Sequence, residues 1–335
     1  MARFILSKAK LIEQYRKLKQ LGSVSYSLKT NPEVGKVLEQ ETDCFFSVHT
    51  KEELHVIKDK SRVWYLAFCW TAKEIDELIK KGVNKFVVCC KPDVTILLEY
   101  LNNNNATIDL LVRMKLQENT IQTGKHFVFG IDAKTVNEII PTLKLHTRKI
   151  GVHVHRKTQN ISEWSLKEEL SELLTKKTLQ QIDIINLGGG LPILYRNSSD
   201  QNIENIFNKI KEVKAWSHKT IIIEPGRFLS GPPITLEAEI KGVFDNTIVL
   251  DCSVYNTAVD TVLCSPIRLL IDGEEEKGQT YLVKGSTPCS LDIMRYAVKL
   301  NNPKVGDKIR FQNAGAYNYT TNFCSLQTVP TIIVD

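Results

Sequence analysis

Residues 26–32 are Tyr26-Ser27-Leu28-Lys29-Thr30-Asn31-Pro32, a stretch that predicts the end of a strand, a turn and the start of a helix. Ser23 to Leu28 alternates apolar and small polar residues, which is typical of a β-strand. Asn31 is a good N-cap, and Pro32 suits the first helical position. Lys29 is therefore expected at the carboxyl end of a strand, where parallel α/β proteins bind ligands and a desolvated lysine can act as a nucleophile. A solvated turn lysine is the alternative interpretation of this stretch alone.

The same unit, an apolar strand followed by an amphipathic helix, repeats through the first two-thirds of the chain. Eight strands are predicted at Ser23 to Leu28, Cys44 to Val48, Val63 to Ala67, Lys85 to Cys90, Thr107 to Met114, Lys149 to His155, Asp183 to Leu187 and Thr220 to Glu224. Helices are predicted at Ile12 to Leu21, Pro32 to Gln40, Lys51 to Lys58, Ala72 to Lys81, Asp93 to Asn102, Ala133 to Leu143, Leu166 to Leu174 and Ile203 to Trp216. Apolar strands that alternate with helices indicate a parallel sheet covered on both faces. Eight such units favour a (β/α)8 barrel of the α/β class over an open doubly wound sheet.

The pattern changes after Phe228, where glycine turns separate short strand-like runs. These runs are Ile234 to Val243, Thr247 to Val254, Ile267 to Ile271, Thr280 to Val283, Lys308 to Gln312 and Thr328 to Val334. They predict an antiparallel β domain. The boundary is expected near Ser230-Gly231-Pro232-Pro233, so that residues 1–230 form the barrel and residues 231–335 form the β domain.

The composition is that of an ordinary folded protein, with 42% hydrophobic and 24% charged residues among 335. The net charge of +6 comes from dispersed lysines, so a small anionic ligand is favoured over nucleic acid. The eight cysteines include no C-x-x-C pair, which is typical of reduced thiols. Neither a signal-peptide pattern nor an apolar span of about 18 residues is found, so a cytoplasmic protein without membrane contact is expected.

Two glycine-containing turns follow the last two predicted barrel strands. Gly188-Gly189-Gly190 comes after the seventh strand, and Glu224-Pro225-Gly226-Arg227 comes after the eighth. In barrel enzymes these loops frequently bind phosphate, because glycines let backbone N–H groups approach an anion. A mobile turn is the alternative interpretation of the triple glycine. Glu224 could keep the ring nitrogen of a lysine-bound heterocycle protonated, although a salt bridge with Arg227 fits the sequence as well.

His153 and His155 lie two residues apart at the end of the sixth predicted strand, so both are expected on the same face. Core histidines are one interpretation of the pair. Zinc is disfavoured because no acidic or cysteine ligand stands at a useful spacing, and no metal site is predicted. An imidazole stacked on a cofactor ring is the favoured functional interpretation.

Five motifs then occur in the order seen in fold-type III pyridoxal phosphate decarboxylases, and the chain resembles the ornithine/diaminopimelate/arginine decarboxylase family. The motifs are Ser27-Leu28-Lys29-Thr30-Asn31-Pro32, Gly151-Val152-His153-Val154-His155, Leu187-Gly188-Gly189-Gly190-Leu191-Pro192, Glu224-Pro225-Gly226-Arg227 and Gly315-Ala316-Tyr317. The resemblance covers nearly the whole chain. It implies a barrel followed by a sandwich-like or barrel-like β domain, with pyridoxal 5'-phosphate as cofactor. It also implies decarboxylation of an L-amino acid, a diamino acid or polyamine precursor, in a head-to-tail homodimer whose sites borrow residues from the partner's β domain.

The resemblance also implies roles for individual residues. Lys29 would bind the cofactor covalently, His155 would stack on its ring, and Glu224 would pair with its ring nitrogen. Arg113 would lie near the cofactor. The phosphate would be surrounded by Gly188, Gly189, Gly190, Arg227 and Tyr317, with Thr158 also in reach, and Gly226 would be a further cofactor contact.

One loop departs from the family pattern. In Gly285-Ser286-Thr287-Pro288-Cys289-Ser290-Leu291-Asp292, a match without gaps puts Pro288 where the family has its cysteine and Cys289 where it has a substrate-reading acid. A shift of one residue would let Cys289 return a proton to the product, and Lys29 is the alternative donor. Ser265 and Asp292 are the predicted substrate contacts, although Cys264-Ser265-Pro266 lacks the aspartate of the ornithine branch.

Three other functions share parts of this pattern. A racemase of the same fold type would use Lys29, but it would pair the ring nitrogen with an arginine, and Glu224 argues against that. A non-catalytic decarboxylase homologue would suit the altered Cys289 loop. A barrel enzyme acting on a sugar phosphate without a cofactor would use the same phosphate loops. The substrate stays open among ornithine, lysine, diaminopimelate, carboxynorspermidine and a specialised-metabolite amino acid.

Overall fold

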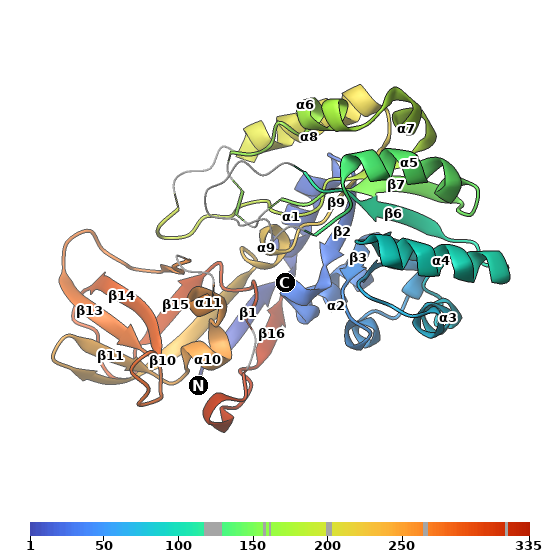
Figure 1. The fold of residues 1–335 in the computed structure, drawn as a ribbon. Coiled ribbons are helices and arrows are strands. Elements are labelled where there is room, and N and C mark those ends of the chain that lie inside the picture. Colours follow the sequence, from blue (N-terminus) through green and yellow to red (C-terminus); the bar gives the residue numbers. More distant parts are fainter. Residues whose placement is uncertain (117–128, 157–158, 161, 199–202, 264–266, 319–320) are drawn as a thin grey trace. The chain divides into compact units, whose positions relative to one another are not determined.

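The eight strands predicted in the first two-thirds of the chain close into a parallel barrel (Figure 1). The computed structural model describes residues 1–116, 129–156, 159–160, 162–198, 203–263, 267–318 and 321–335. The barrel strands are β2 (Ser23–Ser27), β3 (Phe45–Val48), β4 (Val63–Ala67), β5 (Lys85–Val88), β6 (Asp109–Arg113), β7 (Lys149–His153), β8 (Ile184–Asn186) and β9 (Thr220–Ile223). Adjacent strands pair in parallel, and β9 pairs with β2 to close the ring. The predicted (β/α)8 fold class is confirmed.

Helices connect the strands much as predicted. They are α1 (Lys8–Lys19), α2 (Pro32–Glu41), α3 (Ala72–Lys80), α4 (Lys91–Asn103), α5 (Ala133–Lys144), α6 (Leu166–Leu173), α7 (Lys176–Gln181) and α8 (Ile203–Ser217). The helix expected at Lys51 to Lys58 is instead a short 3-10 helix, η2 (Glu52–Val56), and a second one, η3 (Lys60–Arg62), precedes β4. The helix α7 is not predicted from the sequence; it begins where the Thr175 side chain accepts a hydrogen bond from Thr178 N.

The turn around Lys29 has the predicted local structure. β2 ends at Ser27 and is followed by a 3-10 turn, η1 (Leu28–Thr30). The Asn31 side chain then caps α2 by accepting hydrogen bonds from Glu33 N at 3.0 Å and Val34 N at 3.4 Å. Pro32 occupies the first turn of that helix, where a missing N–H costs nothing. Lys29 is therefore held between a barrel strand and a capped helix.

The barrel has a packed apolar interior rather than a channel. Its central cluster consists of side chains from five strands: Trp64, Leu66, Val87, Leu111, Ile184 and Ile222. These residues alternate along each strand with others that face the helices, as expected for a sheet covered on both sides. The axis of the barrel is therefore filled by side chains.

The remaining strands form a second, mixed sheet. They are β1 (Arg3–Ser7), β10 (Ile234–Phe244), β11 (Thr247–Leu250), β12 (Leu270–Ile271), β13 (Gln279–Lys284), β14 (Ile293–Leu300), β15 (Lys308–Gln312) and β16 (Thr331–Val334). The main order is β12-β15-β10-β11-β13-β14, with β1 between β10 and β16. Short helices α9 (Arg227–Ser230), α10 (Val254–Thr257), α11 (Asp260–Leu263) and η4 (Phe323–Ser325) accompany it. The sequence predicts an antiparallel sheet, but the observed sheet is mixed. Its parallel pairs are β1–β16 and β11–β13.

The chain divides into two compact units. The barrel unit comprises Tyr15–Pro192 and Asn202–Gly226, and the sheet unit comprises Met1–Gln14, Ile193–Gln201 and Arg227–Asp335. The sequence predicts that residues 1–230 form the barrel domain. The strand β1 instead pairs with β10 and β16 and belongs to the sheet unit. Within the described residues, no helix is both long enough and apolar enough to cross a bilayer.

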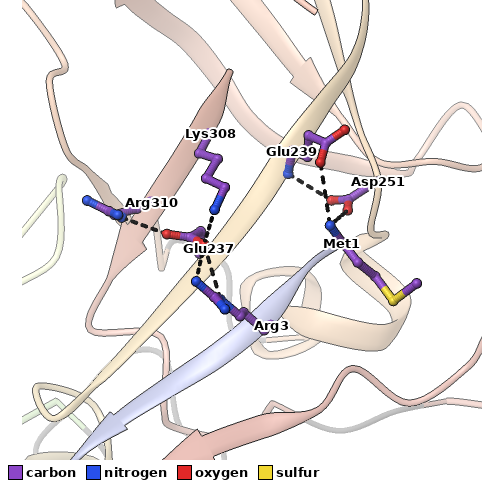
Figure 2. Close-up of polar contacts among 7 residues, drawn as sticks. All are labelled: Met1, Arg3, Glu237, Glu239, Asp251, Lys308 and Arg310. Carbon is purple, nitrogen blue, oxygen red and sulfur yellow. Dashed lines mark hydrogen bonds and ion pairs between the residues drawn. The ribbon is translucent and has the colours of Figure 1, made fainter. Parts of the chain in front are cut away.

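A cross-strand charge cluster holds β1, β10 and β15 together within the sheet unit (Figure 2). Glu237 on β10 is the buried centre, with a side chain only 3% exposed. Its carboxylate lies 2.9 Å from Arg3, from Lys308 and from Arg310. The hydrogen bond from Lys308, followed by that from Arg310, lowers the pKa of Glu237 to about 2, although burial opposes the shift.

We expect Glu237→Gln to lower the free energy of unfolding by about 1–2 kcal/mol at pH 7, since three cations lose their shared carboxylate. The pKa of Glu237 is lower in the folded chain, so its contribution is complete above the unfolded value of 4.5 and is lost as the pH falls towards 2. Urea unfolding should therefore show a difference between wild type and variant that shrinks over this range.

The matched control for this experiment is Glu239→Gln on the same strand. Its side chain is 36% exposed, so a loss of less than about 0.5 kcal/mol is expected. Equal losses in the two variants, or a difference for Glu237→Gln that does not change with pH, would contradict the role of this cluster.

Candidate active site

Five predicted site segments meet at the end of the barrel where its strands finish. Lys29 lies in η1 after β2, Arg113 ends β6, and the others follow β7, β8 and β9: His155, residues 188–190 and Glu224. Parallel strands bring their carboxyl ends to one side of the barrel. Two hydrogen bonds join the last three segments: Gly189 N donates to His155 Nδ1 at 3.1 Å, and Glu224 N donates to Gly188 O at 2.7 Å. The structure thus gathers these residues in one place.

The Lys29 side chain is exposed at this end of the barrel. Desolvation by the surrounding protein still lowers the pKa of its ammonium, and the charge of Arg113 acts in the same direction. The carboxylates of Glu53 and Glu224 oppose this shift. A lowered pKa increases the fraction of neutral amine at neutral pH, and the neutral amine is the nucleophilic form.

Glu224 is a buried carboxylate that is surrounded by donors, and only 6% of the residue is exposed. Its Oε1 accepts hydrogen bonds from Ser47 Oγ and Asn186 Nδ2, both at 2.9 Å. Its Oε2 lies 3.0 Å from His153 Nε2. Burial would raise the pKa of Glu224, but the charge and hydrogen bond of His153, then Asn186 and Ser47, more than offset it and hold the pKa below its ordinary value. Glu224 is therefore ionised at neutral pH.

Two of these donors were not singled out in the sequence. Asn186 ends β8, and its Oδ1 accepts from Gly188 N at 2.8 Å, so the same amide holds both Glu224 and the glycine turn. Ser47 lies on β3 and is 2.8 Å from Ser25 on β2. The sequence feature that could have indicated Ser47 and Asn186 is a polar residue inside an apolar strand, which is unusual where both faces of the sheet are covered.

The glycine turn after β8 has no room for a side chain at its first two glycines, Gly188 and Gly189. Gly188 has a φ of +66°, and a Cβ there would lie 2.3 Å from Val154 O. A Cβ on Gly189 would lie 2.6 Å from Glu224 O. Because glycine has no Cβ, the turn can pass close to Val154 and Glu224, and the N–H of Gly189 reaches His155. Gly188 and Gly189 thus allow the backbone of this turn to pack closely against its neighbours.

The two histidines of the H-x-H motif have different surroundings, contrary to the expectation of a shared face. β7 ends at His153, which is 1% exposed and turns towards Glu224. His155 comes after the strand has ended, so the two-residue alternation no longer applies, and its side chain is exposed. Desolvation and the charges of Arg113 and His153 lower the pKa of His155, which leaves a neutral ring whose Nδ1 accepts from Gly189 N.

Arg227 and Tyr317 are neighbours within the sheet unit. The Arg227 guanidinium forms a two-pronged ion pair with buried Asp260 and donates to Tyr195 Oη at 2.8 Å. Its Cζ lies 5.0 Å from the centre of the Tyr317 ring. The carboxylate partner of Arg227 is therefore Asp260, and the alternative of a Glu224–Arg227 salt bridge is wrong, since Glu224 is held by Ser47, Asn186 and His153.

The loop that carries Cys289 lies between β13 and β14. Asp292 is fully buried, and its carboxylate accepts from Val254 N at 2.8 Å, Thr287 N at 3.0 Å and Thr287 Oγ1 at 2.7 Å. A carboxylate so enclosed organises the loop, and the role of Asp292 as a substrate contact stays a prediction. Cys289 Sγ lies 3.3 Å from Tyr255 Oη, and this hydrogen bond lowers the pKa of the thiol.

The remaining predicted residues are Gly226, Thr158 and Ser265. A Cβ on Gly226 would lie 2.3 Å from Thr30 Oγ1, so glycine lets the loop after β9 pack against the turn that carries Lys29. Thr158 and Ser265 lie outside the described residues.

Comparison with known proteins gives consistent matches. Residues 8–231 match the family described as pyridoxal-dependent decarboxylase, pyridoxal binding domain. The chain is 24% identical to a diaminopimelate decarboxylase of Staphylococcus aureus over 91% of its own length and 80% of that protein. It is 24% identical to a probable ornithine decarboxylase of Dictyostelium discoideum over 95% and 76%. A diaminopimelate decarboxylase structure from Helicobacter pylori, complexed with L-lysine, has the same fold, with a TM-score of 0.84 at 18% identity over 100% and 92% of the two chains.

Proposed function

This chain belongs to the pyridoxal-dependent decarboxylase family, and we propose that it decarboxylates an L-amino acid whose side chain carries a second amino group. The observation that carries the proposal is the pairing of a desolvated lysine, Lys29, with an ionised, buried carboxylate, Glu224, at one end of the barrel. A cationic ring bound covalently to the lysine would find its counter-charge in that carboxylate.

The residues present fit pyridoxal phosphate. Lys29 supplies the amine, Glu224 supplies a fixed negative charge, and the exposed His155 ring supplies a flat neutral surface. The turn at residues 188–190, which passes close to His155 and Glu224, is suited to approach by a phosphate. Arg227 and Tyr317 are also proposed phosphate contacts, and Arg113 adds positive charge nearby. A racemase of this fold type would need a cation at the position that Glu224 occupies.

The chain's own residues hold and orient the reacting groups. Pyridoxal phosphate, when bound, supplies a protonated ring that accepts the electron pair released when carbon dioxide leaves. Lys29 would hold the cofactor through its amine. Glu224 would place its negative charge beside the ring nitrogen, and His155 would cover one face of the ring. Cys289, made more acidic by Tyr255, or Lys29 then returns a proton to the product.

The substrate class follows from the relatives. The matched proteins are named for diaminopimelate and ornithine, and the H. pylori structure was determined with L-lysine. Carbon dioxide release should be assayed with ornithine, lysine, diaminopimelate and carboxynorspermidine, and enantiomer exchange should be followed in parallel. We expect release from at least one of them. Exchange of enantiomers without release would establish the racemase instead, and neither reaction in cofactor-loaded protein would favour a non-catalytic homologue.

We further propose a cytoplasmic homodimer whose active sites are shared between subunits. The seven cysteines among the described residues are free, which suits a reducing compartment. Lys29 lies in the barrel unit and Cys289 in the sheet unit, so a shared site would combine one residue from each subunit.

Mixing two inactive variants tests the shared site. With Cys289 as the proton donor, Lys29→Ala and Cys289→Ala should each be nearly inactive alone. They should recover about a quarter of wild-type activity after subunit exchange, because half of the dimers are mixed and each of these has one intact site. The readout is carbon dioxide release. No recovery, in a mixture shown by mass spectrometry to contain mixed dimers, would contradict sharing.

A further inference from the structure

In the described part of the chain, the His153 side chain is hydrogen-bonded to Glu224. Its Nε2 lies 3.0 Å from Glu224 Oε2, and both side chains are buried, at 1% and 7% exposure. The other ring nitrogen, Nδ1, is also buried, and no hydrogen-bond partner for it is found in the part of the chain that the structure describes. Among the described residues, the imidazole of His153 therefore bonds only the carboxylate of Glu224.

This geometry requires a proton on one particular ring nitrogen. A bare Nε2 would turn its lone pair towards a carboxylate oxygen, so Nε2 carries a proton and donates to Oε2. Ser47 and Asn186 already donate to Oε1, so His153 supplies the donor for the other oxygen.

Hydrogen-bond donors to a carboxylate influence whether a proton shared with another group lies on the carboxylate. A proton between Glu224 and a ring nitrogen can lie on either partner, and each hydrogen bond to the carboxylate favours its ionised form. The proton is thereby left on the ring nitrogen, which is the state that accepts electrons.

We propose that His153 is a positioning residue that, through its Nε2–H bond to Glu224 Oε2, keeps the shared proton on the ring nitrogen of pyridoxal phosphate and off the carboxylate. The inference rests on the proposed pairing of Glu224 with that nitrogen. It concerns the histidine two residues before the proposed stacking residue His155 and gives it a separate task.

The test follows the ring nitrogen directly. Protein loaded with ring-15N pyridoxal phosphate should show a 15N NMR signal that moves towards the unprotonated position in His153→Leu. In the same variant kcat should fall about 10- to 100-fold while KM changes less than about threefold, as expected for a lost hydrogen bond to a charged group. His153→Gln can present an amide N–H close to the position of Nε2, and it should restore both values.

Further variants separate the possible causes. Should His153→Leu fail to fold, as judged by circular dichroism, His153→Asn provides the same test, because its amide is too short to reach Oε2. His146→Leu is the matched control. His146 follows α5 and precedes β7, so it lies at the other end of that strand and should leave the signal unchanged.

The outcomes distinguish the proposed role of His153 from the proposed pairing of Glu224 with the ring nitrogen. If Glu224→Gln moves the nitrogen signal and the His153 variants do not, the role of His153 is overturned while the pairing of Glu224 with the ring stands. If Glu224→Gln leaves the signal in place, the pairing itself is wrong and the role of His153 falls with it. Equal shifts in His153→Leu and His153→Gln would also overturn the inference, since only one of them lacks the donor.

Discussion

Lys29→Ala should lose the visible absorbance of covalently bound pyridoxal phosphate and at least about a thousandfold in kcat. Lys29 is held between β2 and the capped helix α2, at the end of the barrel where the charges of Glu224 and Arg113 act on it. Alanine removes the amine without disturbing the Asn31 cap. Absorbance of the purified, cofactor-loaded protein and carbon dioxide release are the two measurements.

Two further lysine variants make this test specific. Lys29→Arg keeps the positive charge but has no nucleophilic amine, so it should fail as Lys29→Ala does. Lys36→Ala removes an exposed lysine of α2 that pairs with Glu33 at 2.7 Å, and it should retain both absorbance and activity. Wild-type absorbance in Lys29→Ala would exclude Lys29 as the covalent anchor.

Glu224→Gln should lower kcat about 100- to 1000-fold while the lysine-bound absorbance is retained, because the negative charge disappears and Lys29 remains. KM should change much less, since the carboxylate acts on the ring and not on the substrate. Rates and absorbance are measured on the same cofactor-loaded protein. Comparable activity in variant and wild type would show that catalysis does not depend on the charge of Glu224.

The same substitution has a structural cost that must be measured separately. Three side chains donate to the two carboxylate oxygens, whereas glutamine offers one acceptor oxygen and places an amide donor at the other position. A loss of about 1–3 kcal/mol in the free energy of unfolding is therefore expected. Glu224→Asp keeps the charge on a shorter stem and should lose less activity than Glu224→Gln if charge, and not fit, is the main contribution.

Much of the barrel could be predicted because its signals are local. Each strand is a short apolar run, and the runs were placed within a few residues of their observed ends from composition and spacing alone. Asn31 and Pro32 specify the start of α2 by capping rules that involve only neighbouring residues. β1 and β14 are not predicted, because Arg3–Ser7 holds an apolar run of only Phe4-Ile5-Leu6 and Ile293–Leu300 interrupts its apolar residues with Arg295 and Lys299.

The sequence by itself determined the order of the eight barrel strands, the place of Lys29 at a strand end and the glycine turn after β8, since these depend on residues close together in the chain. Only the tertiary structure decided the surroundings of Glu224. Ser47, His153 and Asn186 come from three different strands, and no local pattern indicates that they meet at one carboxylate. The tertiary structure likewise pairs Arg227 with Asp260, which lies 33 residues away in the chain. Hydrogen bonds to a buried charge depend on which strand ends lie together, and the closure of the barrel sets that arrangement.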